Sequence, residues 1–299
     1  VCYTEVPIAG RSASVWYPGV DVSGQPLEAY ELPFSGRKLA ASVIGLPFGG
    51  GTETARVPAG GAVWRGGGVP LDATGSSAVV LVHGFLCTRL DMANIAEALS
   101  AQGSVVVAPE LEDSVSNEGG VYPGGFFGQV LIGREDAERK RRAVVQEAVE
   151  WLRAQGAAEV ALVGHSRGGV TVSQLPGRFC RVNMAGFLPP PVDARENFHP
   201  SAAEGPMLVV CGTEDEVCCR GPSSLEQCRA TAGRLVPQAE TWFPPGVGHF
   251  SLLDPRVLLQ WRARLGPLGP EPPEAAFSCE LVSRVVDFLR QSMGAPPAA

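Results

Sequence analysis

Short apolar runs alternate with amphipathic segments along most of this chain. Continuous apolar runs at Ala78–Val82, Ser104–Ala108 and Met207–Cys211 predict strands that are covered on both faces of a sheet. Apolar residues at helical spacing in Asp91–Ala101 and Arg134–Gln155 predict amphipathic helices. This alternation predicts an α/β protein with a mostly parallel sheet and helices on both faces.

Further elements are expected on both sides of this central stretch. Strands are predicted at Ala13–Tyr17, Lys38–Leu46, Glu159–Val163, Arg181–Leu188 and Glu240–Phe243. Helices are predicted at Ser223–Leu235, Asp254–Leu265 and Cys279–Ser292. Residues 47–68 are rich in Gly and Pro without a period, which predicts an irregular excursion. Because no repeat or linker is evident, we expect one domain over residues 1–299.

One stretch carries the clearest chemical signal. The strand at Glu159–Val163 leads directly into Gly164-His165-Ser166-Arg167-Gly168-Gly169, and a helical segment follows. A strand, a Gly-x-Ser-x-Gly turn and a helix form the nucleophile elbow, whose strained turn exposes the serine hydroxyl. The alternative is a serine in an ordinary Gly-rich turn. We interpret Ser166 as a nucleophile.

A serine nucleophile needs a base, and the chain has four histidines. His83 directly follows a buried strand, His165 points away from Ser166 by strand alternation, and His199 lies in a Pro-rich stretch. His249 follows the last predicted strand, which is where the chain order serine, acid, histidine places the base. We therefore interpret His249 as the base, the alternative being a histidine in a surface loop.

The acid that orients the base is less clearly marked. Asp215 follows the predicted strand that ends nearest to His249, and Asp193 follows the preceding strand. We favour Asp215 and keep Asp193 as the alternative. Glu214 and Glu216 are expected to be solvated turn residues.

The tetrahedral intermediate of ester cleavage needs two backbone N–H donors. One is expected from Arg167, directly after the nucleophile, and the other from Phe85, in the loop after the Ala78–Val82 strand. Gly84 lets that loop turn inward. The Arg167 side chain is interpreted either as a structural salt bridge or as a substrate contact.

Apolar residues gather around these positions. Residues 112–133 form a Gly-rich stretch that is interpreted either as a core cover or as a substrate lid. Leu86, Tyr122, Phe126, Phe127 and Phe250 are the residues expected to bind substrate. An apolar ester therefore fits this site better than a charged one.

Composition narrows the function further. Hydrophobic residues make up 45% of the chain and charged residues 18%, which favours an oily pocket or surface region. Because no apolar run is long enough for a membrane span, we expect a protein that is either soluble or in peripheral contact with a membrane. A net charge of −7 argues against a nucleic-acid surface. The basic run Arg139–Arg142 follows acidic residues, which favours a solvated, ion-paired helix face over a binding patch.

Cysteines do not indicate a metal site, because the chain has no CxxC pair and no HExxH motif. We expect neither a metal nor a cofactor. Cys87, Cys180 and Cys211 are predicted to be buried thiols. One or two disulfides are expected among the loop cysteines Cys218, Cys219, Cys228 and Cys279.

The residues from Ala78 onward resemble the chlorophyllases, enzymes of the α/β-hydrolase fold that remove the phytyl chain from chlorophyll. The resemblance rests on the elbow Gly164–Gly169, on His83-Gly84-Phe85-Leu86 and on Gly248-His249-Phe250-Ser251-Leu252-Leu253-Asp254. It implies an α/β-hydrolase fold, the phytyl ester as substrate, Ser166 and His249 as catalytic residues, and a chloroplast location. The family shows Ile-Asp-Pro where this chain has Phe187-Leu188-Pro189, which supports Asp215 as the acid.

Two other classes share these features. A general lipid esterase, similar to platelet-activating-factor acetylhydrolases or polyester-cleaving enzymes, shares the elbow and the apolar pocket. A non-catalytic ligand-binding homologue would not need a serine, a histidine and an acid together. The chain begins at Val1, which indicates a processed or trimmed chain and leaves the targeting segment unknown.

Overall fold

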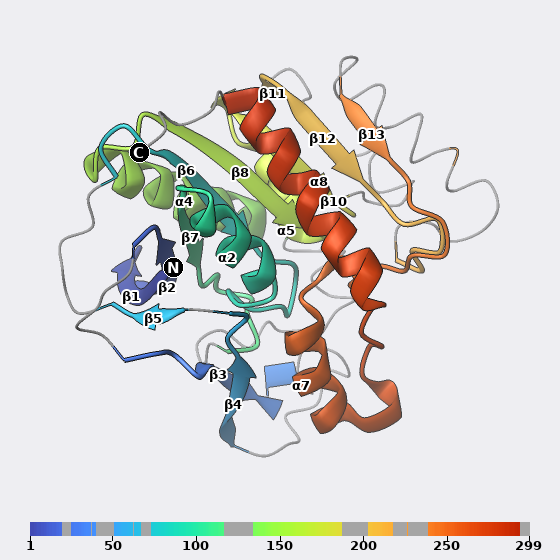
Figure 1. The fold of residues 1–299 in the computed structure, drawn as a ribbon. Coiled ribbons are helices and arrows are strands. Elements are labelled where there is room, and N and C mark those ends of the chain that lie inside the picture. The colour runs from blue at the N-terminus through green and yellow to red at the C-terminus, as the bar shows by residue number, and fades with distance from the viewer. Residues whose placement is uncertain are drawn as a thin grey trace.

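The computed structural model describes residues 1–19, 25–36, 38–39, 51–61, 63–66, 73–116, 134–186, 203–217, 226 and 239–293. Within these residues, nine strands form one twisted sheet at the centre of the molecule (Figure 1). From one edge to the other they are β13 (Glu240–Trp242), β12 (Met207–Val210), β10 (Cys180–Met184), β8 (Glu159–His165), β6 (Ser77–Val82), β7 (Val105–Pro109), β2 (Arg11–Tyr17), β1 (Cys2–Ile8) and β5 (Trp64–Arg65).

The sheet is parallel from β13 through β7, and β2 pairs antiparallel with both β7 and β1. The strands β6, β8 and β12 are fully or almost fully buried, as expected for apolar strands with helices on both faces. Parallel strands end at the same edge of a sheet, so the loops after β6, β8, β12 and β13 meet there. The predicted α/β architecture is confirmed.

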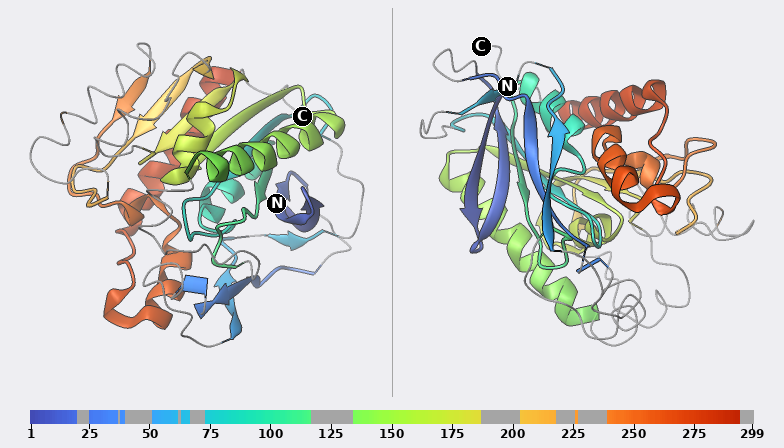
Figure 2. Two further views of the ribbon diagram at one scale, coloured as in Figure 1. Left: turned by 180° about the vertical axis from the view of Figure 1, so that it is seen from behind. Right: turned by 90° about the horizontal axis from the view of Figure 1, so that it is seen from below.

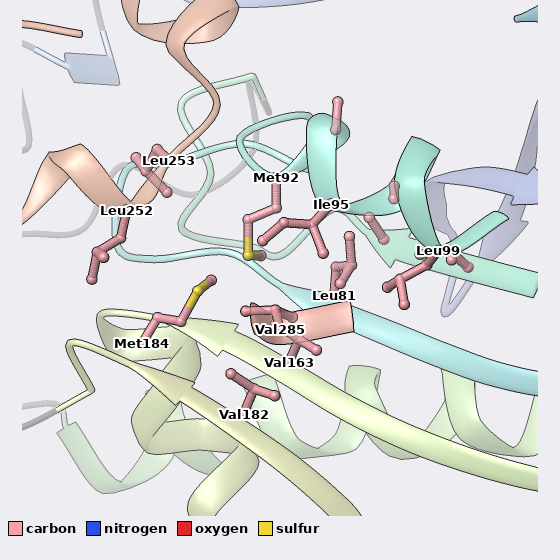
Figure 3. Close-up of a cluster of buried hydrophobic side chains, with 14 of the residues drawn as sticks. Leu81, Met92, Ile95, Leu99, Val163, Val182, Met184, Leu252, Leu253 and Val285 are labelled. Carbon is pink, nitrogen blue, oxygen red and sulfur yellow. The ribbon is translucent and has the colours of Figure 1, made fainter. Parts of the chain in front are cut away.

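Two layers of helices cover the sheet. Helices α2 (Ala93–Ala101) and α8 (Ala275–Met293) lie on one face, and α4 (Arg134–Ala154) and α5 (Arg167–Gln174) lie on the other (Figures 1 and 2). Each face has its own buried apolar cluster. In the first cluster, Leu252 and Leu253 pack with Leu81, Val163 and Val285 (Figure 3). This cluster reaches the chain directly after His249.

The N-terminal region differs from the prediction. Strands β3 (Ala29–Ser35) and β4 (Thr52–Pro58) form an antiparallel pair outside the main sheet, so the predicted irregular stretch 47–68 contains β4 and β5. The strand predicted to begin at Lys38 is wrong there, because Lys38 and Leu39 are helical. The Ser35 hydroxyl oxygen accepts from the Lys38 N–H at 3.2 Å, a contact typical of a helix start.

Helix α7 (Pro255–Leu265) lies beside the β3–β4 pair (Figure 1). The rings of Phe34, in β3, and Trp261, in α7, meet edge to face with their centres 5.3 Å apart. Asp254 caps this helix by accepting from the Arg256 N–H. The small elements are β9 (Gly177–Arg178), β11 (Ala203–Glu204), η2 (Phe250–Leu252) and η3 (Gly266–Leu268).

Several predictions fall on residues that the structure does not describe. These are most of the helix predicted at 223–235, the end of the strand predicted at 181–188, and most of the lid or cover at 112–133, with Tyr122, Phe126 and Phe127. Helix α8 begins four residues before the predicted Cys279. None of the described helices combines the length and the apolar character that crossing a bilayer requires.

Candidate active site

Ser166 lies at the sharp turn between β8 and α5. Its backbone has φ 54° and ψ −123°, a conformation that L-residues adopt only under strain. A Cβ on Gly164 would overlap the Gly168 carbonyl, and a Cβ on Gly168 would overlap the Val82 carbonyl. Only glycine fits at either position. The elbow thus packs against the end of β6 and keeps Ser166 half-buried at the carboxyl edge of the sheet.

His249 and Asp215 come together from the two loops after β13 and β12. His249 Nδ1 lies 2.9 Å from Asp215 Oδ2, and both side chains are buried. The other carboxylate oxygen of Asp215 accepts from the Val217 N–H at 2.9 Å. The Asp215 carboxylate can only accept a hydrogen bond, so it favours the tautomer of the neutral His249 ring that carries its proton on Nδ1. In that tautomer Nε2 carries the lone pair that can accept a proton. The alternative acid, Asp193, lies outside the described residues.

His165 connects the elbow to the histidine loop. Its Nε2 lies 3.0 Å from the His249 carbonyl oxygen, and the centres of the His165 and His249 imidazole rings are 4.9 Å apart. Burial, and then the nearby His249, lowers the pKa of His165 to about 3, so its ring is neutral. Strand alternation predicted only that His165 points away from Ser166. Its burial and its contact with His249, which joins residues 84 positions apart, leave no local pattern.

The loop after β6 lies against the nucleophile. A Cβ built on Gly84 would stand 3.0 Å from Ser166 Cβ. His83 is held inside this loop, since its Nε2 accepts from the Leu111 N–H at 3.1 Å and its Nδ1 donates to the Gly84 carbonyl at 2.7 Å. The Leu86 N–H donates to the Asp113 carbonyl at 3.2 Å. Gly84, which directly precedes the candidate oxyanion donor Phe85, is thus the residue that brings this loop close to Ser166.

Buried charges surround the Arg167 side chain. Arg167 Nε donates to Glu138 Oε1 at 2.5 Å and the guanidinium lies 5.8 Å from the Phe85 ring centre. These contacts favour the salt-bridge interpretation of Arg167. The prediction of a solvated, basic helix face is right for Arg139 and Lys140, which pair with Asp136, and wrong for Arg141, which is 3% exposed.

A cavity of about 540 Å³ opens beside His249. Its apolar lining consists of Leu39, Phe85, Leu86, Phe250, Leu253, Leu258, Trp261, Leu265 and Pro270. Three carboxyl residues, Asp91, Glu216 and Glu271, also line it, and no lysine or arginine does so among the described residues. Glu214 and Glu216 are exposed, as predicted, and Glu216 also accepts from the His249 N–H at 3.2 Å.

Five cysteines among the described residues are thiols that form no disulfide. Cys87, Cys180 and Cys211 are buried thiols, as predicted. Cys279 is an exposed thiol outside any disulfide, so its predicted participation in a bridge is wrong, and it lies in α8 rather than in a loop. The other three predicted partners, Cys218, Cys219 and Cys228, lie outside the described residues.

Comparisons with known proteins support the fold. No protein-family model and no curated protein matches the sequence. Among solved structures, a ferulic acid esterase from Streptomyces cinnamoneus is similar, with a TM-score of 0.57, 18% identity, and 97% of this chain and 88% of that chain covered. TT1662 from Thermus thermophilus has a TM-score of 0.52 and 12% identity, with 98% of each chain covered.

A third similar structure is Est1E from Butyrivibrio proteoclasticus with bound ferulic acid. Its TM-score is 0.50 and its identity 11%, with 97% of this chain and 99% of that chain covered. Together with the mostly parallel sheet, its two helical layers and the elbow after β8, these similarities establish that the chain has the α/β-hydrolase fold.

Proposed function

We propose that this protein is a serine carboxylic ester hydrolase. The observation that carries the proposal is the 2.9 Å contact between His249 and Asp215, two buried residues that are joined to the strained Ser166 turn by the contact of His165 with the His249 carbonyl. An imidazole, its orienting carboxylate and a serine in a strained turn are the parts that acyl transfer through a serine needs.

The mechanism follows from these roles. Ser166 Oγ attacks the ester carbonyl while His249 Nε2 takes the hydroxyl proton. Asp215 holds the ring orientation and stabilises the imidazolium. The N–H groups of Phe85 and Arg167 stabilise the oxyanion, and His249 then protonates the departing alcohol. In the second step His249 activates water, which cleaves the acyl-enzyme and regenerates Ser166.

The pocket favours an uncharged, apolar substrate. Its described lining is dominated by aliphatic and aromatic side chains, and the exposed carboxyl residues Glu216 and Glu271 in it repel anions. Within this class we propose the phytyl ester of chlorophyll, because the motifs around Ser166 and His249 resemble those of chlorophyllases. A chloroplast location and peripheral contact with a membrane belong to the same proposal.

Two alternatives have different substrates or no reaction. A lipid esterase uses the same machinery on a simpler apolar ester, and feruloyl esters are the substrates suggested by the names of two similar structures. A non-catalytic binding protein would keep the pocket without turnover. The 2.9 Å Asp215–His249 contact counts against that last alternative, because simple binding does not require it.

The test compares three esters with matched variants. Purified protein is assayed on chlorophyll, p-nitrophenyl butyrate and methyl ferulate, with Ser166→Ala and with Ser283→Ala, which removes an exposed hydroxyl on α8. We expect chlorophyllide from the wild type and from Ser283→Ala, and a loss of at least about 10⁴-fold in kcat for Ser166→Ala.

The outcomes separate the alternatives. Cleavage of p-nitrophenyl butyrate without cleavage of chlorophyll would keep the esterase proposal and refute the pigment assignment. Faster turnover of methyl ferulate than of the other two esters would point to a feruloyl esterase. Full activity of Ser166→Ala, or binding of chlorophyll without hydrolysis of any ester, would refute the proposed mechanism.

A further inference from the structure

One buried guanidinium ties the loop after β6 to helix α4. Arg141 Nη1 donates to both carboxylate oxygens of Asp113, at 2.5 and 2.6 Å, and its Nη2 donates to the His83 carbonyl. The backbone carbonyl of Asp113 in turn accepts from the Leu86 N–H. Arg141 and Asp113 therefore hold the backbone on both sides of Gly84-Phe85.

A second set of contacts ties the same loop to the elbow. The Thr171 hydroxyl accepts from Arg141 Nε at 3.0 Å and lies 2.9 Å both from Glu138 Oε2 and from the Arg167 carbonyl oxygen. Glu138 also holds the Arg167 guanidinium, which lies over the Phe85 ring and 3.8 Å from Asp113 Oδ2. The contacts thus converge on Phe85 and Arg167, whose N–H groups are the candidate oxyanion donors.

The chemistry of acyl transfer explains why such a network is useful. Oxyanion donors lower the barrier only if they already point at the place where charge develops. Apolar packing holds a loop less directionally than a planar guanidinium, whose five N–H groups have a fixed geometry. The network is almost completely buried, with Asp113 1% and Arg141 3% exposed, so it is shielded from solvent.

Resting on the proposed esterase function, we propose that Arg141 is a positioning residue that aligns the oxyanion loop with the elbow through Asp113, Thr171 and Glu138. Its guanidinium contacts Thr171, Asp113 and the His83 carbonyl, and it acts through these groups rather than on the substrate. Arg141 keeps the Phe85 and Arg167 N–H groups aligned, and these groups bind the oxyanion that forms in the transition state. Its loss should therefore affect kcat rather than substrate binding. The sequence pattern around Arg141 suggested only a solvated helix face.

The test uses Arg141→Lys, which keeps the charge and loses the planar fork. On p-nitrophenyl butyrate we expect kcat to fall about 10- to 100-fold, while KM changes less than about twofold. This fall in kcat should not exceed the one caused by removing a complete oxyanion donor. Affinity for a trifluoromethyl ketone, which forms a tetrahedral adduct with the serine, should fall by the same factor as kcat/KM. Affinity for the matching methyl ketone, measured as competitive inhibition, should not change.

Two variants control for unrelated effects. Arg142→Lys alters the neighbouring residue of α4, which contacts Gln174 instead of the loop. Arg181→Lys alters an equally buried arginine that donates to the carbonyls of Val172, Leu175 and Gly177, away from Phe85. Both should keep kcat within about twofold at temperatures below their melting points, even where Arg181→Lys melts earlier.

A second variant keeps the test decisive if Arg141→Lys does not fold. Thr171→Val has nearly the same volume and removes only the hydroxyl, so we expect a several-fold loss of kcat and of trifluoromethyl ketone affinity. Thr171→Ser, which restores the hydroxyl, should recover both. Equal activity of Thr171→Val and Thr171→Ser would overturn the proposal.

The proposal and the esterase function fail differently. If the wild type cleaves no ester and binds no trifluoromethyl ketone, the proposed function fails and the positioning role fails with it. If the wild type is active while Arg141→Lys keeps kcat within twofold, the positioning role alone is overturned. A parallel loss of affinity for both ketones would also overturn it, because that result indicates a disturbed pocket.

Discussion

The two loops that flank Ser166 are supported in different ways. The loop with His249 continues into Leu252 and Leu253, which pack in the apolar cluster beneath the sheet edge (Figure 3). The loop with Phe85 rests on the buried pair Asp113 and Arg141. An apolar support depends on volume and shape, whereas an ionic support depends on the identity and direction of each partner. Conservative substitutions should therefore be tolerated in the first region and not in the second.

The largest effect is expected at Asp215, the acid that orients the base His249. Asp215→Asn should lower kcat about 10⁴-fold with little change in KM, because the amide no longer enforces the productive tautomer of His249. Steady-state kinetics on p-nitrophenyl butyrate measures this, with the exposed neighbour variant Glu214→Gln as control. A loss below tenfold, together with inactivation by Asp193→Asn, would show that Asp193 is the acid.

Removing one partner of the ionic support should be the most destabilising change outside the reacting residues. Asp113→Ala leaves Arg141 buried without its carboxylate, so the free energy of unfolding should fall by about 3–5 kcal/mol. Urea denaturation measures the change. Asp287→Ala, which removes an exposed carboxylate from α8, is the control. A change below about 1 kcal/mol at Asp113 would mean that the pair is not an essential support.

The apolar support should depend on volume alone. Leu252→Ala should lower the free energy of unfolding by about 2–5 kcal/mol, because it opens a cavity among packed side chains. Leu252→Met conserves volume and should cost less than about 1.5 kcal/mol and leave kcat nearly unchanged. If Leu252→Met were as damaging to kcat as Arg141→Lys, the contrast between the two supports would disappear.

His165 lies between the two loops, against Gly84 and the His249 carbonyl, and should make the protein acid-sensitive. Its pKa is about 3 in the folded chain and about 6.5 when unfolded, so the unfolded state binds more protons between these values. The free energy of unfolding should therefore fall as the pH drops from about 7 to 5. The neighbours of Glu110 lower its pKa to about 2 in the folded chain. Its protonation should therefore lower the free energy of unfolding further as the pH drops below about 4.5.

Melting temperatures at pH 7.5 and pH 5 measure this dependence. His165→Gln should show a smaller decrease than the wild type, since Gln cannot take up the proton. His199→Gln provides a control at another of the chain's four histidines. Equal decreases in the wild type and in His165→Gln would contradict a neutral, buried His165.

Local patterns were sufficient for much of the fold. The apolar runs that became β6, β7 and β12 and the amphipathic segments that became α2, α4 and α7 were predicted within a few residues, because periodicity and burial are coupled in such elements. The same approach failed near the N-terminus. Strand β4 (Thr52–Pro58) alternates between exposed and buried residues only in its second half, which is too short a signal, and its pairing with β3 is a tertiary contact.

By itself, the sequence determined the candidate nucleophile, the base and the preferred acid, because Gly-x-Ser-x-Gly after a strand and the chain order of the other two residues are local or ordinal signals. The tertiary structure alone decided that Asp215 reaches His249, that His165 contacts the His249 carbonyl, and that Arg141 is buried against Asp113. These contacts join residues 34, 84 and 28 positions apart. A charge that looks solvated on one helix becomes an internal partner only when another segment of the chain is packed against it.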